Sequence, residues 1–323
     1  KRQGSRSTLK LPYSYSLISK ANYLSMTHRT LILGSRGSQL ALRQSELVRE
    51  ALLSIHPDLQ IEIKIIKTKG DKLQHLALDT SGDKGLFTGE LEASLRRGEI
   101  DLAVHSLKDL PVDPAEGTCL AAYLPRAVTH DTLVGTCPLE SLPEGAVVGT
   151  SSKRRAYQIA LHYPHLRTEP IRGNVETRIG KVHSGLFDAT LLAEAGLSRL
   201  GMDELERYPI KEAVIVPAPG QAAIAVQTRI NDTELHHLLE SIHDAKTERE
   251  VMIERSLLKR LGGGCALPLG CVCHIMDDQV ELRIFYASSS GEKHYKAKHT
   301  VPLSEIDHLL DHLTDELRSI TTA

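Results

Sequence analysis

The sequence predicts an α/β fold in which two α/β domains are followed by a small α+β domain. Short apolar runs alternate with helical patterns from residue 31 to residue 229, which is typical of mostly parallel sheets. One construction occurs twice, at 31–55 and 146–163: an apolar run ends in a Gly/Ser/Thr turn and a helical pattern begins at once. After residue 266, a hairpin pattern and an amphipathic helix replace the alternation.

In the first domain, the turn at 34–38 is followed by a predicted helix, QLALRQSELVREALLSI. A second helix is expected over 85–98, where Gly98 ends it. An exit loop at 107–111 follows the strand pattern IDLAVHS. The apolar, extended runs that we expect in this domain are 31–33, 61–68, 100–106 and 118–125.

The second domain is expected to repeat this pattern. A strand at 146–149 runs into the helix KRRAYQIALHY, and RGNVETRIGKVHSG at 172–185 predicts an arginine-bearing turn and a helix. DATLLAEAG at 188–196 predicts a strand that continues into a short helix, ended near Gly201. The segment 213–229 predicts two short strands around a Pro-Gly turn.

The third domain differs from the first two in its sequence pattern. Residues 231–261 are helical and charged, and three glycines at 262–264 stop the pattern. CVCHIM and VELRIFYAS predict a β-hairpin, and SEIDHLLDHLTDELRSI at 304–320 predicts an amphipathic helix. The expected division is an N-terminal extension at 1–29, domain 1 at 30–125 with 222–240, domain 2 at 126–221 and domain 3 at 241–323.

Composition narrows the class of protein. The net charge of −2 argues against a general nucleic-acid binder, and no run of about 18 apolar residues predicts a membrane span. The five cysteines follow no disulfide-framework spacing, which favours a reducing compartment. Residues 1–29 hold six Lys/Arg, six Ser and no acidic residue. One interpretation of these residues is a disordered or upstream segment, and a cytoplasmic location is then expected. The other interpretation is an organelle transit peptide.

Arginines gather near the predicted strand ends. A strand that stops at a helix N-terminus directs unpaired N–H groups into a crevice, and the helix dipole there favours an anion. Ligands of such folds bind beyond the carboxyl ends of the strands. The arginines concerned are Arg36, Arg154, Arg155, Arg172, Arg178 and Arg199. Two interpretations stay open: six solvated surface charges, or a shared cleft for a ligand with several negative charges.

Two single residues are candidates for chemistry. Asp109 leaves its strand at the edge of the expected cleft, where a carboxylate can protonate a leaving group or stabilise a developing cation; capping a turn before Pro111 is the alternative. Cys265 follows three glycines, so its thiol can reach a cleft as a nucleophile or attachment point; a buried apolar role is the alternative. The Cys-Val-Cys-His run at 271–274 lacks a second ligand pair, so no metal site is expected.

Taken together and in order, several motifs resemble the porphobilinogen deaminase family, also called hydroxymethylbilane synthases. They are SRGSQLAL, TKGDK, DKGLFTGELE, AVHSLKDLP, GTSSKRRA, RGNVETR, AEAGLSRLG and GGGCALPLG. The resemblance implies two periplasmic-binding-protein-like α/β domains with the active site in the cleft between them, and a third domain that presents a cofactor. It implies a transferase of tetrapyrrole and heme biosynthesis. This enzyme joins four porphobilinogen molecules head to tail, releases ammonia and gives hydroxymethylbilane.

The resemblance also implies roles for particular residues. Asp109 matches the family's catalytic acid, which acts through an azafulvene-like cation, and Cys265 matches the cysteine that holds a dipyrromethane cofactor by a thioether. Further implied cofactor-binding positions are Lys84, Ser106, Lys108, Thr150, Ser151, Ser152, Arg154, Arg155, Gly173 and Gln221. Implied substrate-binding positions are Arg36, Ser38, Arg172, Arg178, Ala193 and Arg199. We expect a monomer that passes its product to uroporphyrinogen-III synthase, with no metal, nucleic-acid or membrane partner.

This chain departs from the family pattern at Lys153, Glu176 and Ala222. Many members have Gly-Gln-Gly-Ala where this chain has Gly-Gln-Ala-Ala, and the extra methyl group is expected to stiffen movement between the domains. Three rival functions are a periplasmic-type anion-binding protein, a phosphate-ester or nucleotide enzyme, and a regulatory protein derived from the enzyme. The first predicts an export signal, the second lacks a P-loop or dinucleotide glycine pattern, and the intact Cys265 and Asp109 argue against the third.

Overall fold

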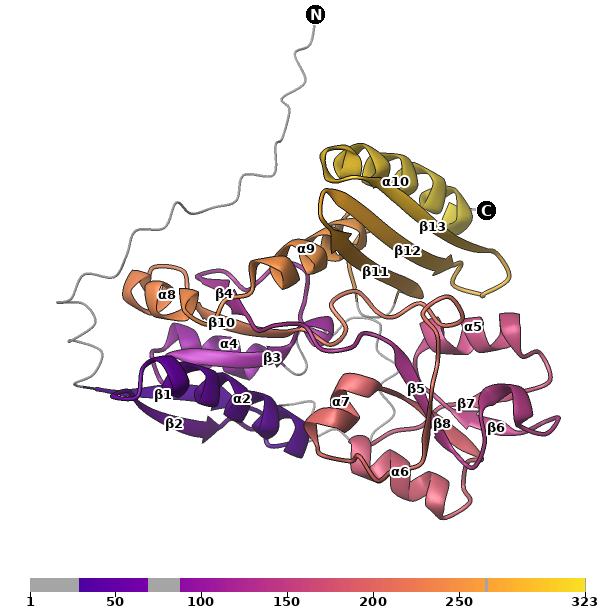
Figure 1. Cartoon of the computed structure of the whole chain (residues 1–323), viewed down its shortest axis with the longest axis horizontal. Helices are drawn as coiled ribbons and strands as arrows, with labels where there is room; N and C mark the ends of the chain where they lie inside the picture. Colours follow the sequence, from indigo (N-terminus) through magenta and orange to yellow (C-terminus); the bar gives the residue numbers. More distant parts are fainter. Residues whose placement is uncertain (1–28, 69–87, 265–266, 323) are drawn as a thin grey trace, which may run out of the picture.

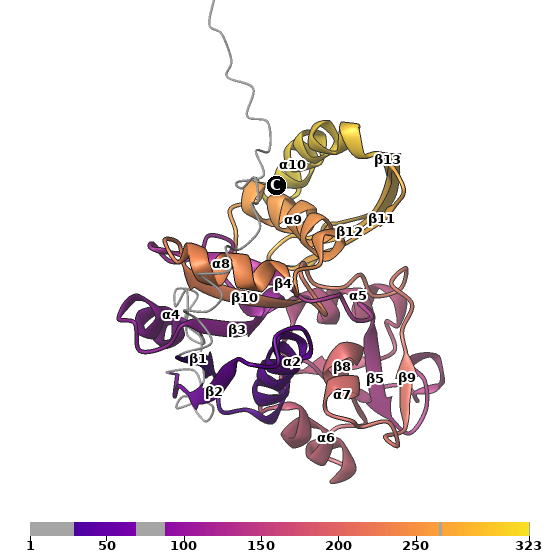
Figure 2. The same ribbon diagram turned by 60° about the vertical axis from the view of Figure 1, so that its left-hand side comes forward.

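The computed structural model describes residues 29–68, 88–264 and 267–322, and it arranges them in three units (Figure 1). Two units each contain a five-stranded sheet, and the third contains a three-stranded sheet. We call the two larger units, each sheet with its helices, the first and second lobes. Figure 2 shows the lobes side by side with the third unit above them. No helix in these ranges is long and apolar enough to cross a membrane.

The first lobe is built on the strand order β2-β1-β3-β10-β4. Its strands are β1 (Thr30–Ser35), β2 (Gln60–Ile65), β3 (Leu102–Ser106), β4 (Thr118–Tyr123) and β10 (Ile224–Arg229). Its helices are α2 (Gln39–Ile55), α4 (Gly89–Arg96) and α8 (Thr233–Glu240). Val48 of α2 and Leu235 of α8 share one core, whereas Leu91 of α4 belongs to another. Helices therefore cover both faces, which explains the near-continuous apolar run of β3.

The second lobe has the strand order β7-β6-β8-β5-β9. Its strands are β5 (Asp131–Gly135), β6 (Val147–Gly149), β7 (Arg167–Glu169), β8 (Ala189–Ala193) and β9 (Arg207–Pro209). Its helices are α5 (Lys153–His162), α6 (Val175–His183) and α7 (Glu194–Arg199), with a 3₁₀ turn at Leu139–Ser141. Ile159 of α5 packs into one core, and Ile179 of α6 with Leu197 of α7 into another.

One strand in each five-stranded sheet runs against the other four. β10 is antiparallel to β3 and β4, and β5 is antiparallel to β8 and β9. The remaining pairings in these sheets are parallel. Each reversed strand follows a segment in which the chain passes from one lobe to the other. The first crossing, residues 124–130, leads into β5, and the second crossing, residues 210–223, leads into β10. The α/β class is thus confirmed, whereas the sheets are mixed: half of the pairings in each are parallel and half are antiparallel.

The third unit is an antiparallel sheet with helices on one face. Leu257 and Leu313 of the helices pack with Ile284 in its core. The strands are β11 (Leu269–Met276), β12 (Gln279–Ala287) and β13 (His294–Pro302), and the helices are α9 (Ala245–Arg260) and α10 (Ile306–Thr322), preceded by a 3₁₀ turn at Leu303–Glu305. Phe285 packs instead with Val216 of the second crossing, which joins this unit to the lobes. The predicted hairpin and C-terminal helix are confirmed.

The structure corrects the prediction of a strand at 213–216, where the chain forms a turn. Side chains of α5 replace the partner that a neighbouring strand would supply. Gln158 Oε1 accepts a hydrogen bond from the Val216 N–H (2.8 Å), and Arg154 donates to the Val216 carbonyl (2.6 Å). Ile215 and Val216, the buried part of this run, are therefore buried without pairing to a neighbouring strand.

The sequence pattern also fails to reveal four strands, β5, β7, β9 and β13. β7 and β9 have three residues each, too few to show a period. β13 is a polar strand, HYKAKHTVP, which suits its place at a sheet edge. The exit loop at 107–111 contains a 3₁₀ turn, Leu107–Asp109. The helix predicted over 85–98 begins at Gly89 within the described part, and residues 85–87 lie outside it. The proposed domain boundaries stay predictions.

Ala222 adopts a left-handed backbone conformation, with φ of +71°, and is buried in the second crossing. This conformation costs a residue with a Cβ about 1–2 kcal/mol, whereas glycine adopts it freely. We therefore expect Ala222→Gly to raise the free energy of unfolding by about 0.5–1 kcal/mol after the added freedom of the unfolded chain is counted. Chemical denaturation measures this change. The neighbouring variant Ala223→Gly is the control and is expected to lower stability; a loss in both variants would contradict the strain at Ala222.

Candidate functional site

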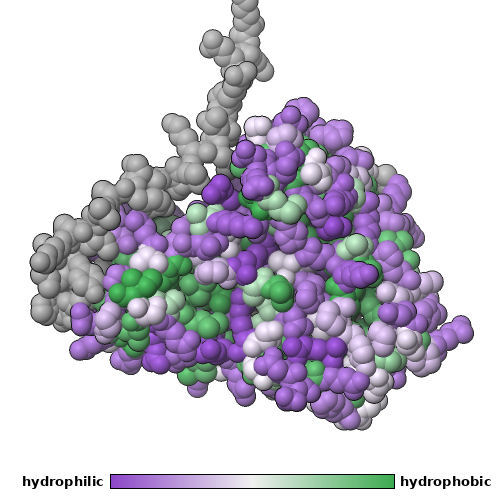
Figure 3. Space-filling view, in the orientation of Figure 1, coloured by the Kyte–Doolittle hydropathy of each residue, from purple (hydrophilic) through white to green (hydrophobic). Residues whose placement is uncertain are grey.

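A small cavity of about 30 Å³ lies where the two lobes meet the second crossing, a region that we call the junction. The first lobe contributes Ser106, the last residue of β3, and the second lobe contributes Ala193, the last residue of β8. Arg199 of α7 and Ala222 of the crossing also line it. The carboxyl ends of strands from both lobes thus face a common space, as expected for this fold class. Figure 3 shows hydrophilic side chains along the boundary between the lobes.

A buried carboxylate, Asp131 at the start of β5, organises the cationic side of the junction. Arg155 donates two hydrogen bonds to it (2.7 and 3.1 Å), and Arg154 donates one (2.9 Å). Gln221 of the second crossing donates a further bond (2.8 Å) and receives one from Lys108 Nζ at 3.4 Å. Asp131 therefore links the start of α5 to the second crossing and, through Gln221, to Lys108 of the first lobe.

The charges of this cluster do not balance. Burial raises and the two arginines lower the pKa of Asp131, which ends below its ordinary value. Burial lowers the pKa of Lys108 to about 8, although Asp109 opposes this shift. Burial also lowers the pKa of Arg154 and of Arg178. Among the described residues, four cations therefore share the two carboxylates of Asp131 and Asp109, and the excess positive charge favours an anionic ligand.

Asp109 is the last residue of the 3₁₀ turn that follows β3, and its side chain is exposed. It interacts electrostatically with Lys108 of the same turn and with Arg178 of the second lobe. Leu107, two residues before Asp109, is fully buried, and its N–H donates to the Ala223 carbonyl (3.0 Å). The fold thus presents the carboxylate to the junction from a backbone anchored in the core.

The two strand–turn–helix constructions differ in how their hydroxyl groups are used. Ser38 caps α2, because its Oγ accepts from the Ala41 N–H (3.3 Å). Ser152 makes no side-chain cap at α5, although its own N–H donates to Thr150 Oγ1 (3.2 Å). Ser151 Oγ donates to the Ile171 carbonyl (2.8 Å). The α5 terminus, which leads into Arg154 and Arg155, is therefore the better placed of the two for an anion.

The remaining arginines surround the junction without forming one cluster. Arg178 Nε donates to the carbonyl of Gly173 (2.9 Å), a residue whose φ of +115° requires glycine. Arg199 donates to the Ala222 carbonyl, and burial lowers its pKa to about 10. Arg172 is exposed, whereas Arg36, just after β1, is half-buried. Lys84 and Cys265, both predicted site residues, lie outside the described residues.

Sequence reasoning missed Asp131 and Gln44. Gln44 of α2 is buried and exchanges hydrogen bonds with Ser106 (2.8 and 3.0 Å), so it orients the last residue of β3. Asp131 precedes an apolar run in HDTLVG. An acidic residue at the start of a buried strand is rarely buried without a partner, so this pattern could have identified Asp131 as a candidate. Of the departures, Lys153 is exposed at the start of α5, and Glu176 lies in the first turn of α6, where the helix dipole favours an acid.

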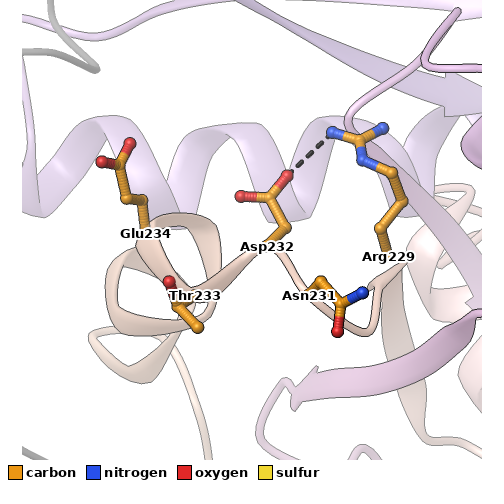
Figure 4. A pocket seen from close by; sticks show the side chains of 5 residues that line it. All are labelled: Arg229, Asn231, Asp232, Thr233 and Glu234. Atoms are coloured by element: carbon orange, nitrogen blue, oxygen red, sulfur yellow. Dashed lines mark hydrogen bonds and ion pairs between the residues drawn. The ribbon is translucent and has the colours of Figure 1, made fainter.

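Two other features are not part of this junction. A surface hollow of about 380 Å³ lies at the start of α8, where Arg229 pairs with Asp232 at 2.8 Å (Figure 4). Within the described ranges, no group of three or more His, Cys, Asp or Glu residues could hold a metal ion. Cys271 and Cys273 point into the core of the third unit, where burial raises the pKa of both thiols.

The fold and the junction define a two-lobed α/β protein with a cation-rich centre, joined to a third unit. Comparison with known proteins names the family. The model of the "porphobilinogen deaminase, dipyromethane cofactor binding domain" matches residues 31–237, and that of the "porphobilinogen deaminase, C-terminal domain" matches 248–309. The chain belongs to the porphobilinogen deaminase family.

Its relatives support this assignment over most of the chain. It is 42% identical over 276 residues to a porphobilinogen deaminase of Desulforudis audaxviator, covering 85% of this chain and 89% of that protein. It is 44% identical over 265 residues to one of Roseiflexus, covering 81% and 88%. The rival interpretation as a non-catalytic anion-binding protein is therefore not favoured.

Solved structures of similar arrangement are more distant. A periplasmic VFT2 domain of BvgS from Bordetella pertussis is 15% identical, with a TM-score of 0.42 over 75% of this chain and 99% of that one. The methionine-binding protein MetQ is 9% identical, with a TM-score of 0.42 over 70% and 94%. These likenesses are too weak to support a conclusion about ligands.

Proposed function

We propose that this chain is a porphobilinogen deaminase, a transferase that joins four porphobilinogen molecules head to tail, releases ammonia and forms hydroxymethylbilane. The observation that carries the proposal is the excess of cations beside the exposed Asp109 in a member of this family: Arg154 and Arg155 are buried, and Lys108 and Arg178 are half-buried. Each porphobilinogen carries an acetate and a propionate, so the growing chain gains negative charge with every unit added. A cation-rich junction suits such a chain.

The same cations fit a dipyrromethane cofactor, which carries the four carboxylates of two porphobilinogen units. When bound, the cofactor supplies the covalent primer to which substrate units are added. Arg154 and Arg155 would hold its carboxylates from the second lobe, and Lys108 would do so from the first. Because Asp131 already holds both guanidinium groups in place, they need little reorganisation when an anion arrives. Cys265 would carry the thioether.

Asp109 would act on the substrate in this arrangement. Loss of ammonia from porphobilinogen leaves positive charge on the substrate, and an exposed carboxylate beside the junction can stabilise that charge and move the proton that the leaving amine needs. Arg178, which interacts electrostatically with Asp109, would meanwhile hold a substrate carboxylate, which orients the reacting carbon toward Asp109.

The other assignments are part of the same proposal. Cofactor contacts would come from Lys84, Ser106, Thr150, Ser151, Ser152, Gly173 and Gln221, and substrate contacts from Arg36, Ser38, Arg172, Arg178, Ala193 and Arg199. We further propose a cytoplasmic monomer that passes its linear product to uroporphyrinogen-III synthase. The domain boundaries given above belong to this proposal too, with the crossings as the links between domains 1 and 2.

Turnover tests the proposed function. The purified protein is incubated with porphobilinogen, and hydroxymethylbilane and ammonia are measured together with substrate consumption. We expect one bilane and four ammonia molecules for every four porphobilinogen molecules consumed. Cys265→Ser is the matched variant and is expected to lose turnover, whereas Cys119→Ser, in β4 of the first lobe, is expected to keep it. Binding of porphobilinogen without ammonia release would contradict the proposal and favour an anion-binding protein.

A further inference from the structure

Helix α9 of the third unit lies along the loop that carries Asp109. Val251 packs in one cluster with Leu107 and Leu110 of that loop. One turn further along the helix, Arg255 hydrogen-bonds the loop backbone. Beyond the end of the helix, a Cβ at Gly263 would lie 3.7 Å from Cγ2 of Val112. Figures 1 and 2 show α9 between the sheet of the third unit and the first lobe.

Arg255 makes an unusual number of contacts with this loop. It is only 4% exposed. Its Nη2 donates to the carbonyls of Pro111 (2.6 Å) and Val112 (2.9 Å). Its Nη1 lies 3.4 Å from the carbonyls of Leu107 and Leu110. The carbonyls flank Lys108 and Asp109 on both sides, and only a planar, multi-donor guanidinium can serve them together.

The position of the Asp109 carboxylate depends on this backbone. In the described part of the chain, the Asp109 side chain takes part in no hydrogen bond or ion pair, and only the electrostatic interactions with Lys108 and Arg178 act on it. The backbone of the loop is held from one side by the Leu107 N–H bond to Ala223 and from the other by Arg255. A shift of the loop would therefore move the carboxylate directly.

We propose that Arg255 is a positioning residue for the acid step, acting through the backbone carbonyls on either side of Asp109. This inference rests on the proposed function, because it assumes that Asp109 acts on the substrate. Helix α9 ends at Arg260, and Cys265 follows five residues later in the sequence. The helix that holds the loop of the acid is therefore also close in sequence to the proposed cofactor attachment point.

Kinetics of Arg255→Lys and Arg255→Met test the proposal, because misplacing a reacting group by about 1 Å costs about 100-fold in rate. We expect kcat to fall about 100-fold in Arg255→Met and about 10-fold in Arg255→Lys, with KM changed less than about 3-fold. Intact mass and thermal unfolding identify the variants that are folded and loaded. Lys259→Met is the matched control, since Lys259 joins the same helix to the same loop through an exposed ion pair with Asp113 (2.5 Å). It is expected to keep the parent kcat. A parent-like kcat in Arg255→Lys would overturn the proposal.

A double-mutant cycle separates positioning from a general structural role. In an Asp109→Asn background, Arg255→Lys is expected to lower the residual rate less than about 2-fold, because the group it positions is already absent. The same 10-fold loss in both backgrounds would show that Arg255 does not act through Asp109.

Amide hydrogen exchange gives a readout independent of turnover. We expect the amides of residues 107–110, 112 and 113 to exchange at least about 10-fold faster in Arg255→Lys than in the parent, and at the parent rate in Lys259→Met. Unchanged exchange in Arg255→Lys would overturn the inference even if the parent makes hydroxymethylbilane. A parent protein that makes no bilane would instead contradict the proposed function, while the exchange result would still report on the loop.

Discussion

Asp109→Asn is expected to lower kcat by about 100- to 10 000-fold while the protein still acquires its cofactor, because an amide can neither carry the proton nor balance positive charge on the substrate. The substitution keeps the size of the side chain, and the exposed position of Asp109 makes a large loss of stability unexpected. The rate of ammonia release at saturating porphobilinogen measures the change, and the intact mass of the same sample reports cofactor loading.

Asp113→Asn is the matched control for this variant. Asp113 lies four residues further along the same loop, is exposed and pairs with Lys259 on the surface. It is expected to keep the parent rate within about 2-fold, since exposed ion pairs contribute little. Turnover by Asp109→Asn at the rate of Asp113→Asn would remove Asp109 from the acid role.

Asp131→Asn is expected to lower the free energy of unfolding by about 3–5 kcal/mol, because two buried guanidinium groups lose the charge that compensates them. Both arginines are almost fully buried, and Asp131 is completely so. Chemical denaturation measures the loss, and intact mass is expected to show a chain without cofactor. Asp188→Asn is the control: its carboxylate accepts from the Val147 N–H (2.7 Å) at the surface of the same lobe, and the variant is expected to lose about 1 kcal/mol or less.

Asp131 also gives the stability of the protein a pH dependence of known sign. Its folded-state pKa lies below the ordinary value of 3.8, so its ion pairs stabilise the folded state fully above the unfolded pKa. This stabilisation is lost as the pH falls below about 4 toward the folded-state pKa. In Asp131→Asn, that part of the acid dependence should be absent. A variant as stable as the parent at pH 7, or as steeply dependent on acid, would contradict the role of Asp131.

Local signals in the sequence were sufficient to predict much of the fold. The helix α2 coincides with the predicted segment because Ser38 supplies a cap and the apolar residues recur at helical spacing. The predicted turn and helix at 172–185 are confirmed, and the structure shows that Asn174 caps α6 through the Thr177 N–H (2.9 Å). Such features depend on neighbours within one turn of helix and are visible without tertiary contacts.

Features that depend on distant contacts were not predictable. The run at 213–216 has a strand composition, yet Gln158 and Arg154 of α5 satisfy its backbone, and no period in the sequence reveals that. The same limit applies to the site. Arg154 and Arg155 were identified as anion-binding candidates from their turn, but their partner Asp131 lies more than twenty residues away, in a strand that the pattern did not reveal. Arg255, whose contacts lie more than 140 residues away, gave no signal at all.

The most direct test of the central claim is the intact mass of the purified protein beside that of Cys265→Ser. We predict that the parent exceeds its sequence mass by one dipyrromethane, either as purified or after reconstitution with porphobilinogen, and that Cys265→Ser shows no excess. A parent chain that stays at its sequence mass after reconstitution would contradict the deaminase mechanism, and so would an equal excess on Cys265→Ser.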